Sequence, residues 1–159
     1  MFQRPPIEPS GEGGFRLRLS GAERELLRGL PGQLRALLAE QPDDPGLRRL
    51  FPPAYEHDDE GEAEYRRLTA AELLEGRQEA LAILEETAGR DRLSAEELDA
   101  WLRALNDLRL VLGTKLDVTE ETYAEDIHRD DPRAHELSVF GYLSWLQEQL
   151  VAAAAGEFD

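Results

Sequence analysis

Leucines recur at spacings of three and four residues through most of the chain, which is the pattern of amphipathic helices. The first such stretch follows Ser20 and Glu23, whose spacing is that of a capping box, and continues to about residue 40. Pro31 lies inside it and removes a backbone donor, so we expect two short helices or one bent helix. Asp44 and Pro45 then predict a brief helical turn, with the aspartate as its cap.

The middle of the chain carries a second capping box. A short helix around residues 62–67 is expected to end before Thr69 and Glu72, which predict the start of the next helix. Leucines at helical spacing follow this box, and Gly89 is the expected terminator.

A third capping box and a last periodic stretch complete the helical pattern. Ser94 and Glu97 predict a helix that ends at Gly113, because glycine readily adopts the left-handed conformation of a helix terminator. The final helix is expected over residues 131–156.

One segment has the period of a strand. Residues 15–19 alternate apolar side chains with arginines, which predicts a half-buried strand. Its partner is left open between residues 1–14, residues 116–118 and another copy of the chain. Residues 1–14 are rich in proline and glycine and are expected to form an irregular lead-in to a single domain over residues 15–156. The sequence thus predicts a mainly α fold, a bundle of four to six helices with a minor N-terminal β element.

The charge is unevenly distributed, and this narrows the possible partners. Residues 1–51 have a net charge of +1, from eight basic and seven acidic side chains, whereas residues 52–159 have a net charge of −17, from ten and 27. Such acidity repels phosphate backbones, so we expect no direct binding of nucleic acid. A basic protein partner is attracted by the same charge. The alternative is that the acidity only keeps the protein in solution.

No stretch carries a catalytic, cofactor or metal motif. His128 and His135 lack a metal-site spacing, and neither a nucleophile elbow nor a glycine-rich phosphate loop is present. Cysteine is absent, which excludes thiol chemistry in these residues. No run of 18 apolar residues and no apolar leader appears, so we expect a cytoplasmic protein without a membrane span.

The segment "WLRALNDLRLVLGTKLDVTEE" at 101–121 places polar side chains among its leucines. The candidate polar edge consists of Asn106, Asp107, Arg109 and Lys115. We predict that Arg109 pairs with Asp59 or Glu64 of the acidic 56–64 segment, and that Asn106 bonds the backbone there. This pairing would fasten the acidic segment to the bundle. The alternatives are a partner-binding surface and simple exposure to solvent.

One aromatic side chain of the last helix stands apart from the others. Trp145 lies beside the main apolar stripe of its helix, and large exposed aromatic side chains tend to mark partner surfaces. It is therefore a candidate partner-surface residue.

Three stretches together resemble a known family: "LFPPAYEHDDEGEAEYRRLT" at 50–69, the 101–121 segment, and "YLSWLQEQLV" at 142–151. They are similar to an actinobacterial family of a domain of unknown function that includes the oxidative-stress regulator AosR. The resemblance spans nearly the whole chain from about residue 15. It implies a cytoplasmic regulatory protein without established enzyme activity, acting through proteins of the transcription machinery, with a sigma factor as the suggested partner. It also implies a response through a cysteine pair, which this chain lacks.

Three functional hypotheses follow. The first is a non-enzymatic interaction module, a transcriptional co-regulator that binds a protein partner through its acidic C-terminal two-thirds. The second is a small ligand-binding or hydrolase-like domain that uses the Asn106 to Arg109 edge, for which a deep pocket lined by these residues would be the sign. The third is a homodimeric scaffold, which would show a large uncovered apolar helix face.

Overall fold

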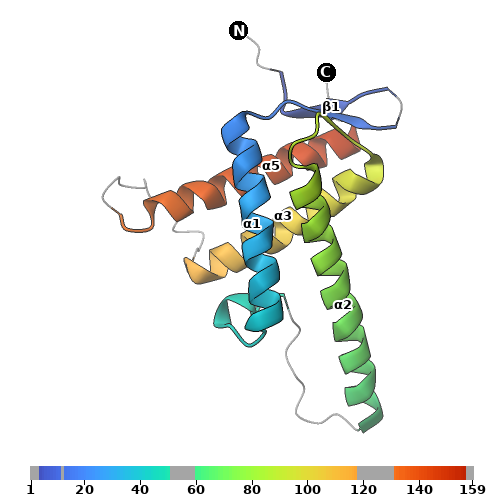
Figure 1. Ribbon diagram of the computed structural model, residues 1–159, viewed down its shortest axis with the longest axis vertical. Helices are drawn as coiled ribbons and strands as arrows, with labels where there is room; N and C mark the ends of the chain where they lie inside the picture. The colour runs from blue at the N-terminus through green and yellow to red at the C-terminus, as the bar shows by residue number, and fades with distance from the viewer. Residues whose placement is uncertain (1–3, 12, 51–59, 118–130, 157–159) are drawn as a thin grey trace.

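The computed structural model describes residues 4–11, 13–50, 60–117 and 131–156. Four α-helices lie within these residues: α1 (Gly21–Glu40), α2 (Glu60–Thr87), α3 (Ala95–Lys115) and α5 (Ala134–Ala155). As Figure 1 shows, α1 and α2 lie side by side and cross α3 and α5, which form a second layer. The mainly α fold predicted from the sequence is confirmed.

Helix α1 begins at the predicted capping box and continues through its proline. The Ser20 hydroxyl accepts from the Glu23 amide at 3.1 Å, and the Glu23 carboxylate accepts from the Ser20 amide at 3.0 Å. Pro31 is buried inside one uninterrupted helix, so the option of two short helices is wrong. Leu27 and Leu34 are buried on either side of it, and this packing outweighs the one backbone hydrogen bond that proline cannot make.

The short 3-10 helix η1 (Pro45–Leu47) follows, capped by Asp44 as predicted.

Helix α2 is longer than the sequence indicated. Thr69 and Glu72 lie inside it, so the second capping box does not start a helix, and the separate helix at 62–67 is the first part of α2. Residues 62–75 contain neither proline nor glycine, so nothing interrupts the helix there. It ends at Thr87, close to the predicted terminator Gly89. The Arg28 guanidinium lies directly over Gly89 and would have to move to make room for a Cβ there.

A small antiparallel sheet closes one end of the bundle. Its order is β1-β2-β3, formed by β1 (Ile7–Pro9), β2 (Phe15–Leu17) and β3 (Arg92–Leu93). The predicted strand therefore pairs with the segment before it, one of the candidates left open, and also with β3, which was not among them. The expectation of an irregular lead-in over 1–14 is wrong at residues 7–9. Ile7 pairs with Leu17 and is fully buried, which draws this segment onto the core.

The predicted end of α3 is displaced by packing. The helix passes Gly113 and reaches Lys115, and the left-handed residue is Asp117, with a φ of 52°. Gly113 serves a different purpose, because a Cβ there would lie 3.0 Å from Cε2 of Phe140 on α5. The glycine therefore lets α3 and α5 approach closely. Helix α5 ends at Ala155, and the left-handed Gly156 follows it, so the predicted end of this helix is confirmed.

Two glycine substitutions test this close contact. We expect Gly113→Val to lower the free energy of unfolding by about 1–3 kcal/mol, because the added methyl groups overpack the contact with Phe140. Gly29 lies in α1 with open space around its Cβ position. Gly29→Ala should therefore raise the free energy of unfolding by about 0.5–1 kcal/mol. Urea denaturation followed by circular dichroism measures both, and equal shifts would contradict the packing role of Gly113.

The main core is a cluster consisting mostly of leucines and alanines, with Trp101, between the two helix layers, and Leu116, Leu137 and Phe140 form a second, smaller cluster. Trp101 is fully buried, and its Nε1 donates to Oγ1 of Thr87 at 2.6 Å. That hydroxyl donates in turn to the carbonyl of Ile83 at 2.6 Å. No helix in the described part of the chain has the length and apolar character needed to cross a membrane.

Candidate functional site

The polar edge of α3 has one deeply buried member, Asp107, which is 4% exposed. Arg77 of α2 donates from Nη1 to Oδ1 of Asp107 at 2.5 Å and from Nη2 to the carbonyl of Leu50 at 2.9 Å. One guanidinium thus joins α2, α3 and the segment that follows η1. An ion pair does join α3 to a neighbouring element, but it is formed by Arg77 and Asp107 and not by Arg109.

The predicted pairing of Arg109 with Glu64, the one predicted partner that lies within the described residues, is not found. Arg109 is half-buried and forms no hydrogen bond or ion pair with the described residues, and Glu64 is exposed on α2 without a bond to it. Asp59, the other predicted partner, lies outside the described residues. Arg109 lies about 200° around the helix from Asp107, so it does not face the α2 side chain that Asp107 meets. The Asn106 side chain is half-buried and forms no hydrogen bond to backbone groups within the described part of the chain.

Burial dominates the electrostatics of Asp107. It raises the pKa of the Asp107 carboxyl, because removal from water disfavours the charged form. The hydrogen bond and the positive charge of Arg77 oppose this rise without cancelling it. Arg77 therefore favours the ionised form of a carboxyl whose burial favours the neutral form.

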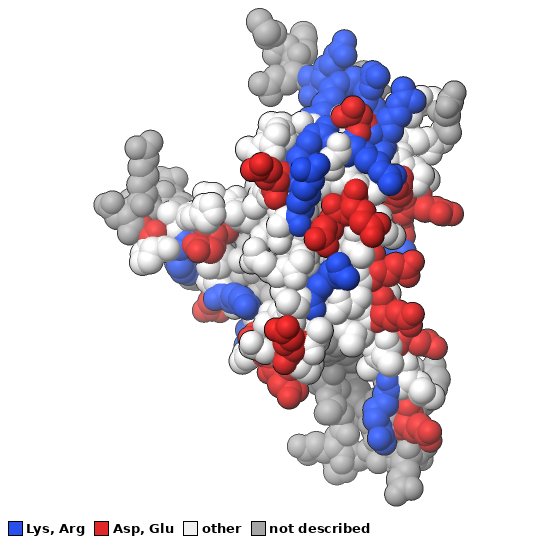
Figure 2. All heavy atoms as spheres, viewed as in Figure 1, with Lys and Arg blue, Asp and Glu red and all other residues white. Residues whose placement is uncertain are grey.

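An acidic groove runs along the surface between α2 and α3. Two adjoining hollows of about 500 and 370 Å³ share Gly76 and Arg103. We call them together the α2–α3 groove, and its charged lining consists of Glu72, Arg77, Glu79, Glu96, Asp99, Arg103 and Asp107. Figure 2 shows acidic side chains following the length of α2.

Three carboxylates of the groove are available to a partner. Arg103 pairs with Asp99 at 2.7 Å, and Arg77 pairs with Asp107. Glu72, Glu79 and Glu96 form no ion pair with the described residues and are exposed. Two large apolar side chains of α2 are also exposed, Leu68 at 62% and Leu73 at 46%, and Leu73 lines the groove. The groove therefore combines negative charge with apolar surface.

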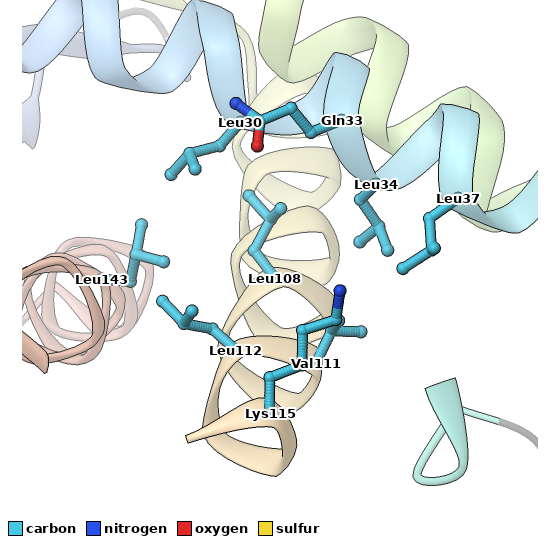
Figure 3. A pocket seen from close by; sticks show the side chains of 9 residues that line it. All are labelled: Leu30, Gln33, Leu34, Leu37, Leu108, Val111, Leu112, Lys115 and Leu143. Carbon is cyan, nitrogen blue, oxygen red and sulfur yellow. The ribbon is translucent and has the colours of Figure 1, made fainter. Parts of the chain in front are cut away.

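Lys115 lies away from this groove, at a pocket lined mainly by leucines (Figure 3). The pocket has a volume of about 130 Å³ and lies between α1, α3 and α5. Lys115 is the only lysine of the chain, and its stem packs against Gly46 of η1. Neither Asn106 nor Arg109 lines this pocket, so the four candidates do not form one site.

The ligand-binding alternative required a pocket lined by Asn106 to Arg109. Asn106 and Asp107 do line one hollow of the α2–α3 groove, but Arg109 is not part of it. Among the described residues, no group of three or more histidine, aspartate or glutamate side chains is placed to hold a metal ion.

Trp145 is 42% exposed on α5, beside its buried leucines. Its ring centroid lies 5.9 Å from that of Tyr142. The Tyr142 hydroxyl donates to Oε2 of Glu23 at 2.7 Å, which joins α5 to α1. Burial tends to raise the pKa of Glu23, but the hydrogen bonds it accepts from Tyr142 and Ser20 outweigh burial and lower it. The role of Trp145 as a partner surface stays a prediction.

Sequence reasoning missed Arg77, although a signal was present. Arg77 stands three residues after Leu74 and four before Leu81, on the apolar stripe of its helix. Asp107 stands three residues after Ala104 and four before Val111, on the buried stripe of α3. Opposite charges on two buried stripes predict a pair, because an isolated buried charge is strongly disfavoured.

Comparisons with known proteins identify a family and relatives that are named as regulators. Residues 4–154 match the family model described as a domain of unknown function (DUF2017). The oxidative stress regulator AosR of Mycobacterium tuberculosis is 29% identical over 181 residues, covering 89% of this chain and 83% of that protein. The AosR relative of Mycobacterium leprae is 32% identical over 148 residues, covering 82% of this chain and 66% of that protein, just under two thirds of its length. No solved structure matches the chain.

Proposed function

The chain belongs to the DUF2017 family, and we propose that it is a cytoplasmic, non-enzymatic regulatory protein that binds a protein of the transcription machinery, such as a sigma factor. The observation that carries this proposal is the similarity to proteins named oxidative stress regulators, which extends over 89% of the chain. A regulator without catalytic chemistry acts by contact, so the surface that makes the contact has to be identified.

The α2–α3 groove supports this function best. Its three unpaired carboxylates attract a basic segment, and electrostatic complementarity favours both the rate and the specificity of such association. Leu68 and Leu73 offer apolar contacts beside these charges. The proposed partner therefore presents a segment that is both basic and apolar, as an amphipathic helix does.

This chain has no cysteine, so it has no thiol of its own that could react with an oxidant. None of its 159 residues forms a disulfide or a thiolate. Under this proposal, any oxidant signal is sensed by the partner, and this chain contributes the binding surface.

Charge reversal in the groove tests the proposal. We expect Glu72→Lys with Glu79→Lys to weaken binding to a purified sigma factor of the source bacterium by about tenfold or more, since attraction becomes repulsion. The matched control is Glu148→Lys, which changes an exposed charge on α5 and should leave affinity unchanged. Isothermal titration at two salt concentrations measures both, and wild-type binding should weaken as salt rises.

Two results would reject parts of the proposal. Equal affinity of wild type and the double variant for a sigma factor would exclude the α2–α3 groove as the binding surface. Failure of the wild-type chain to bind every sigma factor of that bacterium would exclude a sigma factor as the partner.

A further inference from the structure

Basic side chains gather at the end of the molecule that carries the sheet. Figure 2 shows this concentration beside the acidic side chains of α2. Strands β2 and β3, the turn after α2 and the first half of α1 all contribute to it. We call it the arginine face, and its members are Arg4, Arg16, Arg18, Arg24, Arg28, Arg90 and Arg92.

Three of these arginines have partners within the fold. Arg18 pairs with Glu8, and Arg90 pairs with Glu97 at 2.9 Å. Arg24 contacts Asp91 at 3.2 Å and donates to the carbonyls of Ala88 and Arg90 at 3.2 and 2.6 Å. These contacts hold the sheet and the turn after α2 against α1. They are structural, and they use the carboxylates available nearby.

The other four arginines form no such direct contact, although Glu8 attracts Arg4 and Arg16 at longer range. Arg4, Arg16, Arg28 and Arg92 are exposed and form no ion pair with the described residues. Within the described part of the chain, no carboxylate therefore neutralises these four guanidinium groups by direct contact.

Arg16 and Arg92 stand directly opposite each other in the sheet. The register pairs Arg16 of β2 with Arg92 of β3, and Glu8 of β1 lies on the other side of Arg16. Directly opposed residues of antiparallel strands have Cβ atoms about 4.5–5.5 Å apart, and like charges in this position are destabilising. An anion bound between the two guanidinium groups would remove this repulsion.

We propose that the arginine face binds an acidic segment of a second polypeptide, separate from the partner of the α2–α3 groove. Guanidinium groups bind carboxylates through paired hydrogen bonds, and every free cation of this face is an arginine. In an extended segment, alternate side chains point to the same side, so acidic residues two apart face the same arginines. The chain would then join two oppositely charged segments, which goes beyond the proposed function.

A nucleic acid fits this surface less well. A phosphate backbone carries its charge over a long continuous line, and outside the arginine face it would meet a protein with a net charge of −16. A short acidic peptide segment carries its negative charge only over the length of the arginine face, so it avoids the acidic surface beyond it. A second copy of the chain is a separate outcome of the test, because in a two-fold dimer the arginine face of each copy would contact an acidic surface of the other.

The test uses a fluorescently labelled decapeptide of alternating glutamate and serine, with binding measured by fluorescence anisotropy at low and physiological salt. We expect the wild-type protein to bind it and Arg16→Gln with Arg92→Gln to weaken binding about three- to tenfold. The matched control is Arg48→Gln with Arg49→Gln, which removes two exposed charges elsewhere and should keep wild-type affinity. Thermal melting should show that the first double variant is no less stable than wild type, because a repulsion has been removed.

Three outcomes would overturn the proposal. The first is no binding of the decapeptide by the wild-type protein, or equal losses in the two double variants. The second is tighter binding of a short DNA duplex than of the peptide, which would make the surface a nucleic-acid site. The third is concentration-dependent self-association in sedimentation velocity that Arg16→Gln with Arg92→Gln abolishes. Glu72→Lys with Glu79→Lys should still bind the decapeptide, so failure of the groove and failure of the arginine face are distinguishable.

Discussion

Replacing Arg77 with methionine is expected to lower the free energy of unfolding by about 2–4 kcal/mol at pH 7.5, because removing one partner of a buried pair leaves an uncompensated charge. The charge is that of Asp107, which is 4% exposed and has Arg77 as its cation. The carbonyl of Leu50 loses its donor in the same variant. Methionine keeps most of the apolar stem, so the loss reports mainly on the charge and the hydrogen bonds.

The effect of Arg77→Met should depend on pH. Burial raises the pKa of Asp107 above its usual value, and removal of Arg77 raises it further. A carboxyl whose pKa is higher in the folded than in the unfolded state destabilises the fold above the folded pKa, and this penalty fades as pH falls through that pKa. The destabilisation should therefore be smaller at pH 5 than at pH 7.5. Urea denaturation at the two pH values measures the difference.

The matched control combines Arg77→Met with Asp107→Asn. Asparagine carries no charge to leave unpaired, so the double variant should be more stable than Arg77→Met alone. A cost for Arg77→Met that is below about 0.5 kcal/mol, the range of ordinary surface substitutions, would show that the pair does not fasten the bundle. A cost that is independent of pH would show that Asp107 is not the group responsible.

Trp101→Ala should cost more than any other single change considered for this protein, about 3–5 kcal/mol in the free energy of unfolding. The indole is fully buried between α2 and α3, and its removal opens a cavity that leucines and alanines on two helices cannot fill. Chemical denaturation followed by circular dichroism at 222 nm measures the loss without relying on tryptophan fluorescence.

Thr87→Val separates the polar from the apolar part of this contact. Valine has nearly the shape of threonine but accepts no hydrogen bond, so the Trp101 N–H is left buried without a partner. We expect a loss of about 1–3 kcal/mol. A Thr87→Val loss as large as that of Trp101→Ala would contradict the view that cavity formation dominates at Trp101.

The features that the sequence predicted well are those determined by neighbouring residues. The boxes at Ser20 and Ser94 involve side chains and amides three residues apart, and both formed as predicted. Thr69 and Glu72 have the same spacing, yet they lie inside α2 because the residues before Thr69 are already helical. A capping box forms only where the capping residue leaves the helix, and the pattern alone does not determine that.

The features that the sequence did not predict depend on contacts between distant segments. Gly113 has the sequence position of a terminator, but the ring of Phe140 on α5 determines its role. The partner of Asp107 lies 30 residues away on α2, and only the crossing of the two helices selects Arg77. The pairing of Arg16 with Arg92 likewise depends on β3, a strand of two residues that hydropathy alternation does not reveal.

Helix α2 extends beyond the rest of the bundle at its N-terminal end (Figure 1). Among its described side chains, Ala80 is the first that is buried, and Leu68 and Leu73 are exposed before it. We therefore expect its two halves to differ in local unfolding free energy, with the C-terminal half opening only with the core and the half that carries Leu68 and Leu73 opening at a lower cost. A partner bound at Leu68 and Leu73 would lengthen the stable part of the helix. The helical content of this protein would then rise when the groove is occupied, and it would report on binding.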